Sequence, residues 1–351
     1  MATARSSTIP GLVRPRLGPA LTNEVYAPAP EIVELVCKHG MSASNALFDP
    51  GCSQFRVRGV DGLVPYRMAW GSVVAIGEPV CAREDSVTLA RALTAAARRR
   101  GLATVYAVTS PWFANRMAEH GAAAIAFGSE VQLDPGADPT RGSKGRELRK
   151  KLNHAARAGL RAGEYDHENF ASRFVEAELT RVAEEWLRNR RGPQVFLTGI
   201  RLFEAPAITR HFHVRYGDRY VGVLTAMRLE TRDGYLLNQI VTTPDAPDGT
   251  SELLITHALA TLGSEGCHFA TFGAAPADSL GAMMNVSPWS ERLARKVFDA
   301  AGEAFHLDAR AHYRRKFQAA NEEPAFLVFD PPRIRLRQVA ALLRAFNVSL
   351  A

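Results

Sequence analysis

The sequence predicts an α/β (α+β) protein built from two related units, each containing a mixed sheet. Three observations predict this class. Apolar residues make up 46% and charged residues 23% of the 351 residues, a composition typical of a packed globular protein. Short alternating runs typical of strands stand between longer runs with helical spacing. The order helix, antiparallel strands, then helix–strand–helix–strand recurs roughly in both halves.

The first unit is expected over residues 24–135. Residues 1–23 contain no acidic residue and no continuous apolar core, so we expect a disordered tail and not a secretory signal. Gly101 is expected to end one helix, and Ser110 with Pro111 to begin the next, because these residue types are favoured at those positions. Apolar spacing predicts these elements: helices over 31–39, 86–100 and 110–121, and strands over 53–59, within 63–80 and over 103–110.

The second unit is expected over residues 162–332. Turn-forming residues fill 134–145 and mark the boundary, so we expect a linker with a basic helix over 136–161. Residues 333–351 are expected to form a C-terminal amphipathic helix. Apolar spacing predicts these elements: helices over 145–158, 170–190, 251–266, 290–305 and 333–346, and strands within 211–243 and over 267–274 and 324–330.

Charge and composition narrow the function. No stretch approaches the about 18 consecutive apolar residues that a membrane span requires. The four cysteines show no CxxC spacing, which favours reduced thiols in the cytoplasm. The formal net charge is +7, so nucleic acid and anionic lipid are the first partners to consider.

A cationic segment over residues 141–161 carries eight basic residues and one acid, Glu147. On a helix several of the basic residues lie close to one face, which suits a phosphate backbone. A solvated helix face is the alternative. The residues expected to bind tRNA are Lys144, Arg146, Arg149, Lys150 and Arg157.

The same segment resembles the basic helix of the phosphatidylglycerol lysyltransferase C-terminal domain family. Four further segments are similar to motifs of that family in the same order, and together the five span about residues 55–330. Each motif is weak alone, but five in register are specific. The five segments are GSVVAIGEPVCA, GSKGRELRKKLNHAARAG, TPDAPDGTSELLI, GCHFATFGAAPADSLG and HYRRKFQAA.

The resemblance implies two tandem acetyltransferase-like (GNAT-like) folds around a shared channel. It also implies transfer of an aminoacyl group from aminoacyl-tRNA, as co-substrate and without another cofactor, to an acceptor nucleophile. Members acting on lipid usually carry an Asp-x-x-Arg pair where this sequence has Asn238 and Val241, and an N-terminal membrane domain that this sequence lacks. An arginine is the natural clamp for a lipid phosphate. We therefore expect a soluble small-molecule acceptor: a hydroxyl, an amine or, as in related enzymes of natural-product (antibiotic) biosynthesis, a hydroxylamine.

Three alternatives stay open. The acceptor can be phosphatidylglycerol or another lipid, reached through peripheral contact of the helix over 333–346 with an anionic membrane; an amphipathic helix docked on its own domain has the same pattern. The chain can instead be an acyl-CoA-dependent N-acetyltransferase, or a non-catalytic RNA-binding protein.

Polar residues in the matched segments are the candidates for catalysis. Asp248 and Glu252 stand four residues apart where a turn opens a helix, so one can act as a base or hold the aminoacyl ammonium. Capping of that helix is their alternative role. Asn238 can orient the acceptor or simply form a turn at the end of a strand. Thr250 is assigned to substrate binding.

Lys316 is the candidate for stabilising the oxyanion or for gripping the tRNA terminus. Arg314 is expected two residues earlier on the same strand face, and a surface charge pair is the alternative. Arg314 and Gly273 are assigned to substrate binding.

Histidines give weaker signals. His211 and His213 share one strand face, but nothing nearby in the sequence completes a ligand set, so we expect no metal. His154 and His312 lie in matched segments and can act as bases or be exposed side chains. No GxGxxG, Walker A or GxSxG pattern is present.

Overall fold

A computed structural model gives the fold. The expected tail and the last five residues of the chain lie outside the described residues, so the prediction for the tail is not addressed. The described residues are 28–168, 172–189, 200–203, 205–305 and 313–346.

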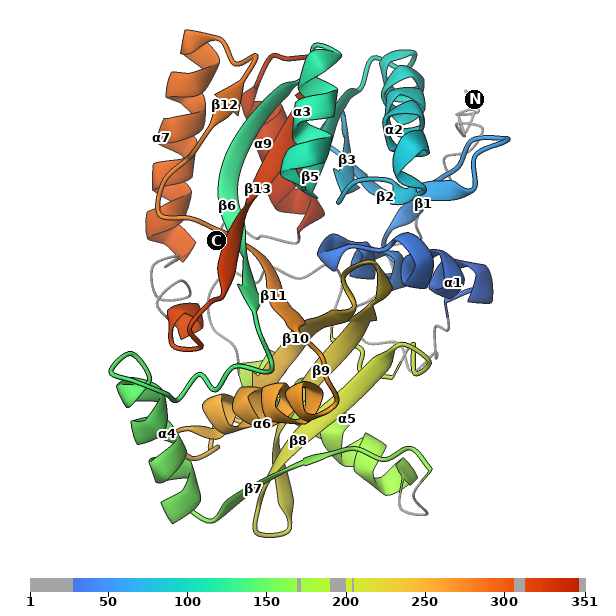
Figure 1. Ribbon diagram of the computed structural model, residues 1–351. Coiled ribbons are helices and arrows are strands. Elements are labelled where there is room, and N and C mark those ends of the chain that lie inside the picture. Colours follow the sequence, from blue (N-terminus) through green and yellow to red (C-terminus); the bar gives the residue numbers. More distant parts are fainter. Residues whose placement is uncertain (1–27, 169–171, 190–199, 204, 306–312, 347–351) are drawn as a thin grey trace, which may run out of the picture.

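The helices alternate with strands along most of the chain (Figure 1). The α-helices are α1 (Pro30–His39), α2 (Arg83–Arg98), α3 (Pro111–Glu119), α4 (Arg146–Arg157), α5 (Ser172–Asn189), α6 (Thr250–Ser264), α7 (Pro288–Phe305) and α9 (Leu336–Ala345), and the 3-10 helices are η1 (Ser42–Phe48) and η2 (Glu230–Arg232). The strands are β1 (Ser53–Phe55), β2 (Gly62–Ala69), β3 (Ser72–Ile76), β4 (Val80–Cys81), β5 (Ala103–Thr109), β6 (Ala123–Leu133), β7 (Leu160–Glu164), β8 (Thr209–Tyr216), β9 (Arg219–Leu229), β10 (Gly234–Thr242), β11 (Phe269–Pro276), β12 (Met283–Met284) and β13 (Asn321–Asp330).

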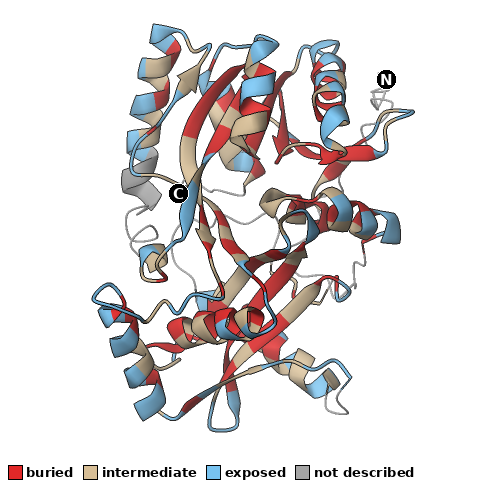
Figure 2. Cartoon of the chain, viewed as in Figure 1, coloured by how far each residue is buried: buried red, intermediate tan, exposed pale blue. Residues whose placement is uncertain are grey.

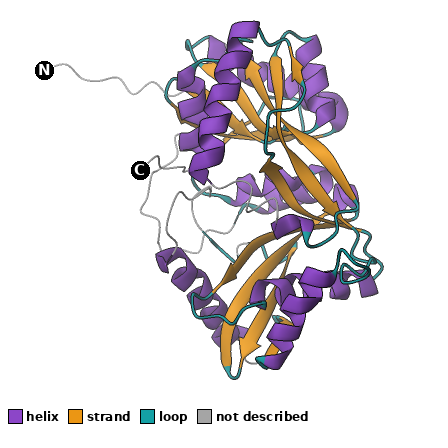
Figure 3. Cartoon of the chain, turned by 90° about the vertical axis from the view of Figure 1, so that its left-hand side faces the viewer, coloured by secondary structure: helices purple, strands orange, loops and turns teal. Residues whose placement is uncertain are grey.

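The described strands form one mixed sheet of 13 strands that runs through both halves. Its order is β1-β2-β3-β5-β13-β6-β11-β10-β9-β8-β7, with β4 beside β2 and β12 beside β6. Figures 1 and 3 show the first half above the second, joined where β13, β6 and β11 lie side by side. The α/β class with mixed strand pairing, predicted from the sequence, is confirmed.

Each half contains one parallel strand pair joined by a helix. In the first half, β3 and β5 are parallel and α2 connects them. In the second half, β10 and β11 are parallel and α6 connects them. The helices bury their apolar faces on the sheet, and Figure 2 shows these faces as red stripes; Leu93 of α2 and Leu254 of α6 are fully buried.

The end of the chain returns to the first half. β13 pairs with β5 and β6, although the division at 162–332 places it in the second unit. α9 packs on β2, β3 and β5, with Ala341 and Ala345 buried against Val74 and Ala107. The docked alternative for this helix is therefore confirmed over Leu336–Ala345.

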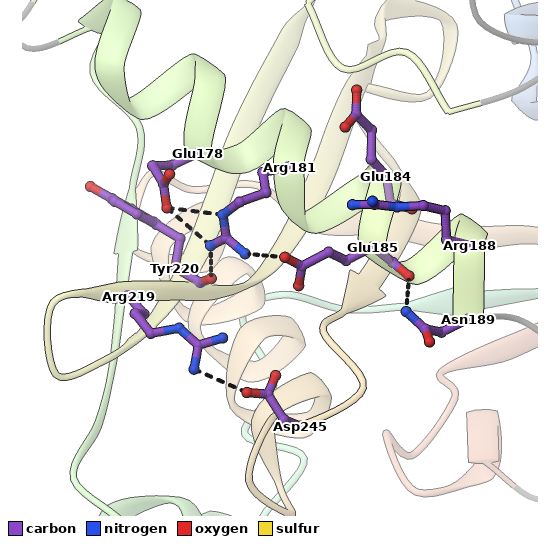
Figure 4. Close-up of polar contacts among 9 residues, drawn as sticks. All are labelled: Glu178, Arg181, Glu184, Glu185, Arg188, Asn189, Arg219, Tyr220 and Asp245. Carbon is purple, nitrogen blue, oxygen red and sulfur yellow. Dashed lines mark hydrogen bonds and ion pairs between the residues drawn. The ribbon is translucent and has the colours of Figure 1, made fainter.

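α5 is fixed to the second half by a polar network (Figure 4). Arg181 donates to Glu178 at 2.9 Å and to Glu185 at 2.8 Å on its own helix. Its guanidinium also donates to the backbone carbonyl of Tyr220 on β9 at 3.0 Å. One side chain thus connects the helix to the sheet.

Two expectations need correction. β6 and β7 are strands that the apolar pattern does not predict. The segment expected to carry Arg314 and Lys316 on one strand face is helical over 313–315 and a turn over 316–317. The prediction of a shared strand face is wrong, because this segment turns back toward the sheet before β13 begins.

Candidate functional site

The parallel strands of the second half separate soon after they pair. β10 and β11 pair at only three positions, which end at Leu236 and Thr271. Beyond them β10 contains Gln239 with φ 47° and β11 contains Gly273 with φ 72°. Both strands also shift register with their other neighbours there. These irregularities turn the two strands apart next to the start of α6.

A buried ion-pair cluster lies beside this point. Lys316 Nζ is 3.3 Å from Glu252 Oε1, in the first turn of α6, and 2.9 Å from Glu147 Oε1, in the first turn of α4. The side chains of Lys316 and Glu252 are only 11% and 6% exposed. Burial disfavours the charged lysine, but the hydrogen bond to Glu147 and the charge of Glu252 outweigh it and raise its pKa. The cluster therefore holds the ammonium of Lys316 in its charged form between buried Glu252 and Glu147, which is 47% exposed.

Two neutral side chains complete the cluster. Ser251 Oγ donates to Glu252 Oε2 at 3.1 Å. Lys316 Nζ lies 5.2 Å from the ring centroid of Tyr313, within range of a cation–π interaction. Burial raises the pKa of Tyr313, so its hydroxyl stays protonated. Glu147, Ser251 and Tyr313 were missed by sequence reasoning, although Glu147 is the one acid of the cationic segment.

Arg314 and Gly273, both predicted for substrate binding, contact each other. Arg314 Nη1 donates to the carbonyl of Gly273 at 3.0 Å, and Nη2 to that of Phe272 at 3.4 Å. These bonds hold the turn that carries Lys316 against β11.

Asp248 lies apart from the Lys316 cluster, in an exposed ion pair. Lys151 Nζ of α4 donates to both its carboxylate oxygens, at 2.6 and 2.8 Å. This hydrogen bond holds the pKa of Asp248 below its usual range. Thr250 is buried, and its Oγ1 donates to the carbonyl of Pro247 at 2.5 Å. Both residues fix the turn into α6.

α4 lies directly against that turn. Gly249 has φ 91°, and a Cβ built on it would stand 2.3 Å from the carbonyl oxygen of Lys151. Only glycine fits a left-handed position with backbone this close. The basic helix is thus fixed against the first turn of α6.

Asn238 lies within β10 at its irregularity, and the prediction that it stands at a strand end is wrong. Its Oδ1 accepts from the backbone N–H of Gln239 at 2.8 Å, and its carbonyl accepts from Thr225 Oγ1 at 3.0 Å. Its side chain therefore stabilises the bulge, as turn-forming asparagines do. Val241, in the position of the family's arginine, is buried.

The five residues predicted to bind tRNA are exposed on α4 and the loop before it (Figure 2). Arg149 donates to the carbonyls of Thr140 and Gly142 and so closes the loop onto its helix. Arg146, Lys150 and Arg157 lie on the surface of α4, whose Glu147 reaches Lys316, and Lys144 lies on the loop before it.

The histidines do not assemble a site among the described residues. His211 is buried with Nε2 2.6 Å from the carbonyl of Leu202. His213 packs on Tyr220, and burial lowers its pKa to about 4. His154 is exposed, and His312 lies outside the described residues. In the described part of the chain no group of three or more His, Cys, Asp or Glu is arranged to hold a metal, and no helix is long and apolar enough to cross a membrane.

Comparisons with known proteins agree with this fold. The C-terminal domain of a proposed lysylphosphatidylglycerol synthetase from Agrobacterium fabrum is 21% identical, with a TM-score of 0.73 over 91% of this chain and 96% of that one. L-PGS from Bacillus licheniformis is 17% identical, with a TM-score of 0.74 over 92% and 98%. A protein of unknown function from Bacteroides thetaiotaomicron is 11% identical, with a TM-score of 0.55 over 85% and 95%. No curated protein sequence matches the chain.

One family model covers most of the chain. The model for "Phosphatidylglycerol lysyltransferase, C-terminal" matches residues 34–329, which include α4, α6 and the Lys316 cluster. The chain therefore belongs to the phosphatidylglycerol lysyltransferase C-terminal family, a family of aminoacyltransferases.

Proposed function

We propose that the chain is an aminoacyl-tRNA-dependent aminoacyltransferase of the cytoplasm that acts on a soluble small-molecule acceptor. One observation carries the proposal: the helix with the exposed cationic face also supplies Glu147 to the buried Lys316–Glu252 pair. A single rigid element thus connects a surface suited to tRNA phosphates with a buried charged cluster.

The reaction needs few groups. The acceptor nucleophile attacks the carbonyl carbon of the aminoacyl ester, the bond from that carbon to the ribose oxygen breaks, and the ribose oxygen takes up a proton. Lys316 stabilises the oxyanion or donates that proton, because its ammonium is held charged by Glu147 and Glu252. Glu252 and Glu147 position it.

The other predicted residues act as supports in this proposal. Asp248 fixes α4 to the start of α6, and Asn238 fixes the bulge of β10. Arg314 and Gly273 hold the Lys316 turn on β11 beside the bound ester. Thr250 closes the turn before α6.

Acyl-CoA is a weaker donor candidate. A pyrophosphate bound at the start of α6 would meet Asp248, just before the helix, and Glu252, in its first turn. Negative side chains compete with an anion for the positive end of a helix. The start of α6 therefore does not favour acyl-CoA.

A lipid acceptor is less well supported than a soluble one. The apolar side of α9 packs on the sheet through Ala341 and Ala345, so these residues are not available to a bilayer. The position of the family's arginine holds buried Val241, which cannot clamp a lipid phosphate.

The test is consumption of charged tRNA. The full-length chain is incubated with tRNA charged with radiolabelled amino acids, one at a time, and with a panel of soluble amines, hydroxylamines and alcohols. We expect label to move from one or more charged tRNAs to a soluble acceptor faster than spontaneous hydrolysis releases it. Phosphatidylglycerol vesicles and acetyl-CoA with the same amines serve as the two competing arms.

The outcomes separate the candidates. Label in vesicles would replace the soluble acceptor by a lipid, and acetyl transfer from acetyl-CoA would replace the donor. If no charged tRNA is bound or consumed in any arm, the proposed donor is wrong.

A further inference from the structure

A pocket lies where the parallel strands of the first half separate. Pairing between β3 and β5 ends at Ile76 and Ala107. Gly77, directly after β3, is left-handed with φ 82°, and so is Val108, near the end of β5, with φ 64°. The pocket that opens there is in part continuous with solvent. It is the first-half counterpart of the place where β10 and β11 separate.

Three carboxyl groups line this pocket, together with hydroxyl groups. Glu78 follows β3, Glu130 lies on β6 and Glu323 lies on β13. Glu130 is paired with Glu323 on one side and with Ala274 of β11 on the other. Ser110 donates to Glu78 at 3.2 Å. The acids therefore belong to separate elements that converge on one space.

The negative charge of the pocket is only partly compensated. Arg232 lies 3.4 Å from Glu323, which also accepts from Gln132 at 3.0 Å. Burial raises the pKa of Glu78 to about 7, opposed by Ser110 and Arg83 and supported by the charge of Glu323. Burial also raises the pKa of Glu130, opposed by Thr271, Ser42 and Arg232. A cation or a proton donor would be stabilised here.

β11 connects the pocket to the turn that carries Lys316. Ala274 lines the pocket and follows Gly273, whose carbonyl accepts from Arg314. Arg314 in turn holds the segment that carries Lys316. The pocket and the turn that carries Lys316 thus contact neighbouring residues of β11.

We propose that this pocket binds the acceptor as a small basic nitrogen compound, an amine or a hydroxylamine, and that Glu78 accepts its proton. The inference rests on the proposed function and names its acceptor class. Converging carboxylates attract an ammonium group and repel a phosphate. Glu78 and Glu130 thus select the acceptor by charge, and a phosphate headgroup is rejected.

The proton balance is simple for an amine. The bound ammonium gives one proton to Glu78 and becomes a nucleophile. Its nitrogen forms a bond to the ester carbonyl carbon, the bond to the ribose oxygen breaks, and an amide forms. The nitrogen loses a second proton, the ribose oxygen gains one, and Glu78 releases the first proton to solvent.

A binding experiment tests the pocket without the reaction. The probe is n-butylamine, titrated against the full-length chain and followed by ligand-observed NMR, with 1-butanol and glycerol 3-phosphate as comparisons. We expect n-butylamine to bind best and the E78Q/E130Q variant to weaken it about tenfold or more, because a charge-assisted contact is lost. Glu322 is the matched control, because it is the exposed neighbour of Glu323 on β13 and lies outside the pocket. E322Q should leave n-butylamine binding unchanged.

The proposal is overturned if E78Q/E130Q binds n-butylamine as the wild type does, or if glycerol 3-phosphate binds more tightly than n-butylamine. The single variants E78Q and E130Q replace the double variant if it does not fold. Binding through these carboxylates without consumption of any charged tRNA would refute the proposed function and leave the pocket assignment standing. Transfer to alcohols alone, without n-butylamine binding, would refute only the acceptor class.

Discussion

The two β–α–β units share a connection and differ in the charges that surround it. In both, a parallel pair separates within a few residues and a helix joins its strands. Carboxyl groups such as Glu78 and Glu130 line the opening of the first unit, whereas Lys316 and Arg314 lie at that of the second. The repeated backbone thus provides two similar openings. Carboxyl groups predominate at the first, whereas at the second the cations Lys316 and Arg314 are balanced by Glu252 and Glu147.

The start of the connecting helix differs as well. α2 begins after Ala82, an ordinary residue without a side-chain cap. α6 begins after Gly249, and α4 packs there so closely that Lys151 would clash with any side chain. In the second unit α4 therefore covers the start of α6 and places a cationic surface beside it. This addition distinguishes the unit proposed to receive tRNA.

The largest expected effect is on transfer by the second unit. K316M removes the ammonium near the ester, and we expect the single-turnover rate of aminoacyl transfer to fall by about 10²–10³. R315M is the matched control, because Arg315 is the cation directly before Lys316 in the sequence. Its side chain is 66% exposed and forms a surface pair with Asp278. It should transfer at nearly the wild-type rate. Equal losses in both variants would show that Lys316 has no special role.

The next effect is on stability at the start of α6. G249A combines a left-handed alanine, which costs about 1–2 kcal/mol, with overpacking against α4 of about 1–3 kcal/mol. Thermal denaturation followed by circular dichroism measures the loss. G266A is the control, because Gly266 has φ 83° with nothing within 4 Å of a built Cβ. If G249A and G266A lowered the melting temperature equally, the close approach of α4 to Gly249 would be disproved.

Local patterns predicted most elements but not how distant segments pair. The meander of β8, β9 and β10 follows from alternation and from turns at Gly217 and Gly234. β6 was missed because its start is rich in alanine and contains a single β-branched residue, Ile125. β13 could be predicted as a strand, but its place between β5 and β6 is a long-range pairing that no local pattern specifies.

The candidate site shows the same limit. Glu252 and Lys316 could be selected as charged residues in matched segments, and the structure brings them to 3.3 Å. Glu147 could not be linked to them, because its partner lies far along the chain. Asp248 was chosen for the same reason as Glu252. It lies four residues earlier in the sequence, and its side chain is on the surface beside Lys151. Burial, which separates the two acids, depends on how α4 packs.

The smallest effect concerns the Asp248–Lys151 pair, which fastens α4 to the second unit. The pKa of Asp248 is lowered in the folded chain, so the pair stabilises the fold above the usual aspartate pKa of about 4, and this contribution is lost as the pH falls through the folded pKa. Because Asp248 is 56% exposed, we expect K151M to cost less than about 1 kcal/mol at pH 7.

In urea denaturation series the cost of K151M should shrink as the pH falls through the lowered pKa of Asp248, because below that pKa both proteins carry a protonated Asp248. His154 Nδ1, 3.8 Å from Asp248, remains in K151M and retains part of the effect. K150M, on the same helix, is the comparison and should show no such pH dependence. A K151M cost that stays constant as the pH falls would mean that the Asp248–Lys151 pair does not help to hold α4, which is then held by its buried residues Leu148 and Ala155 and by Glu147. In that case the charge of Lys151 would be available to a polyanion.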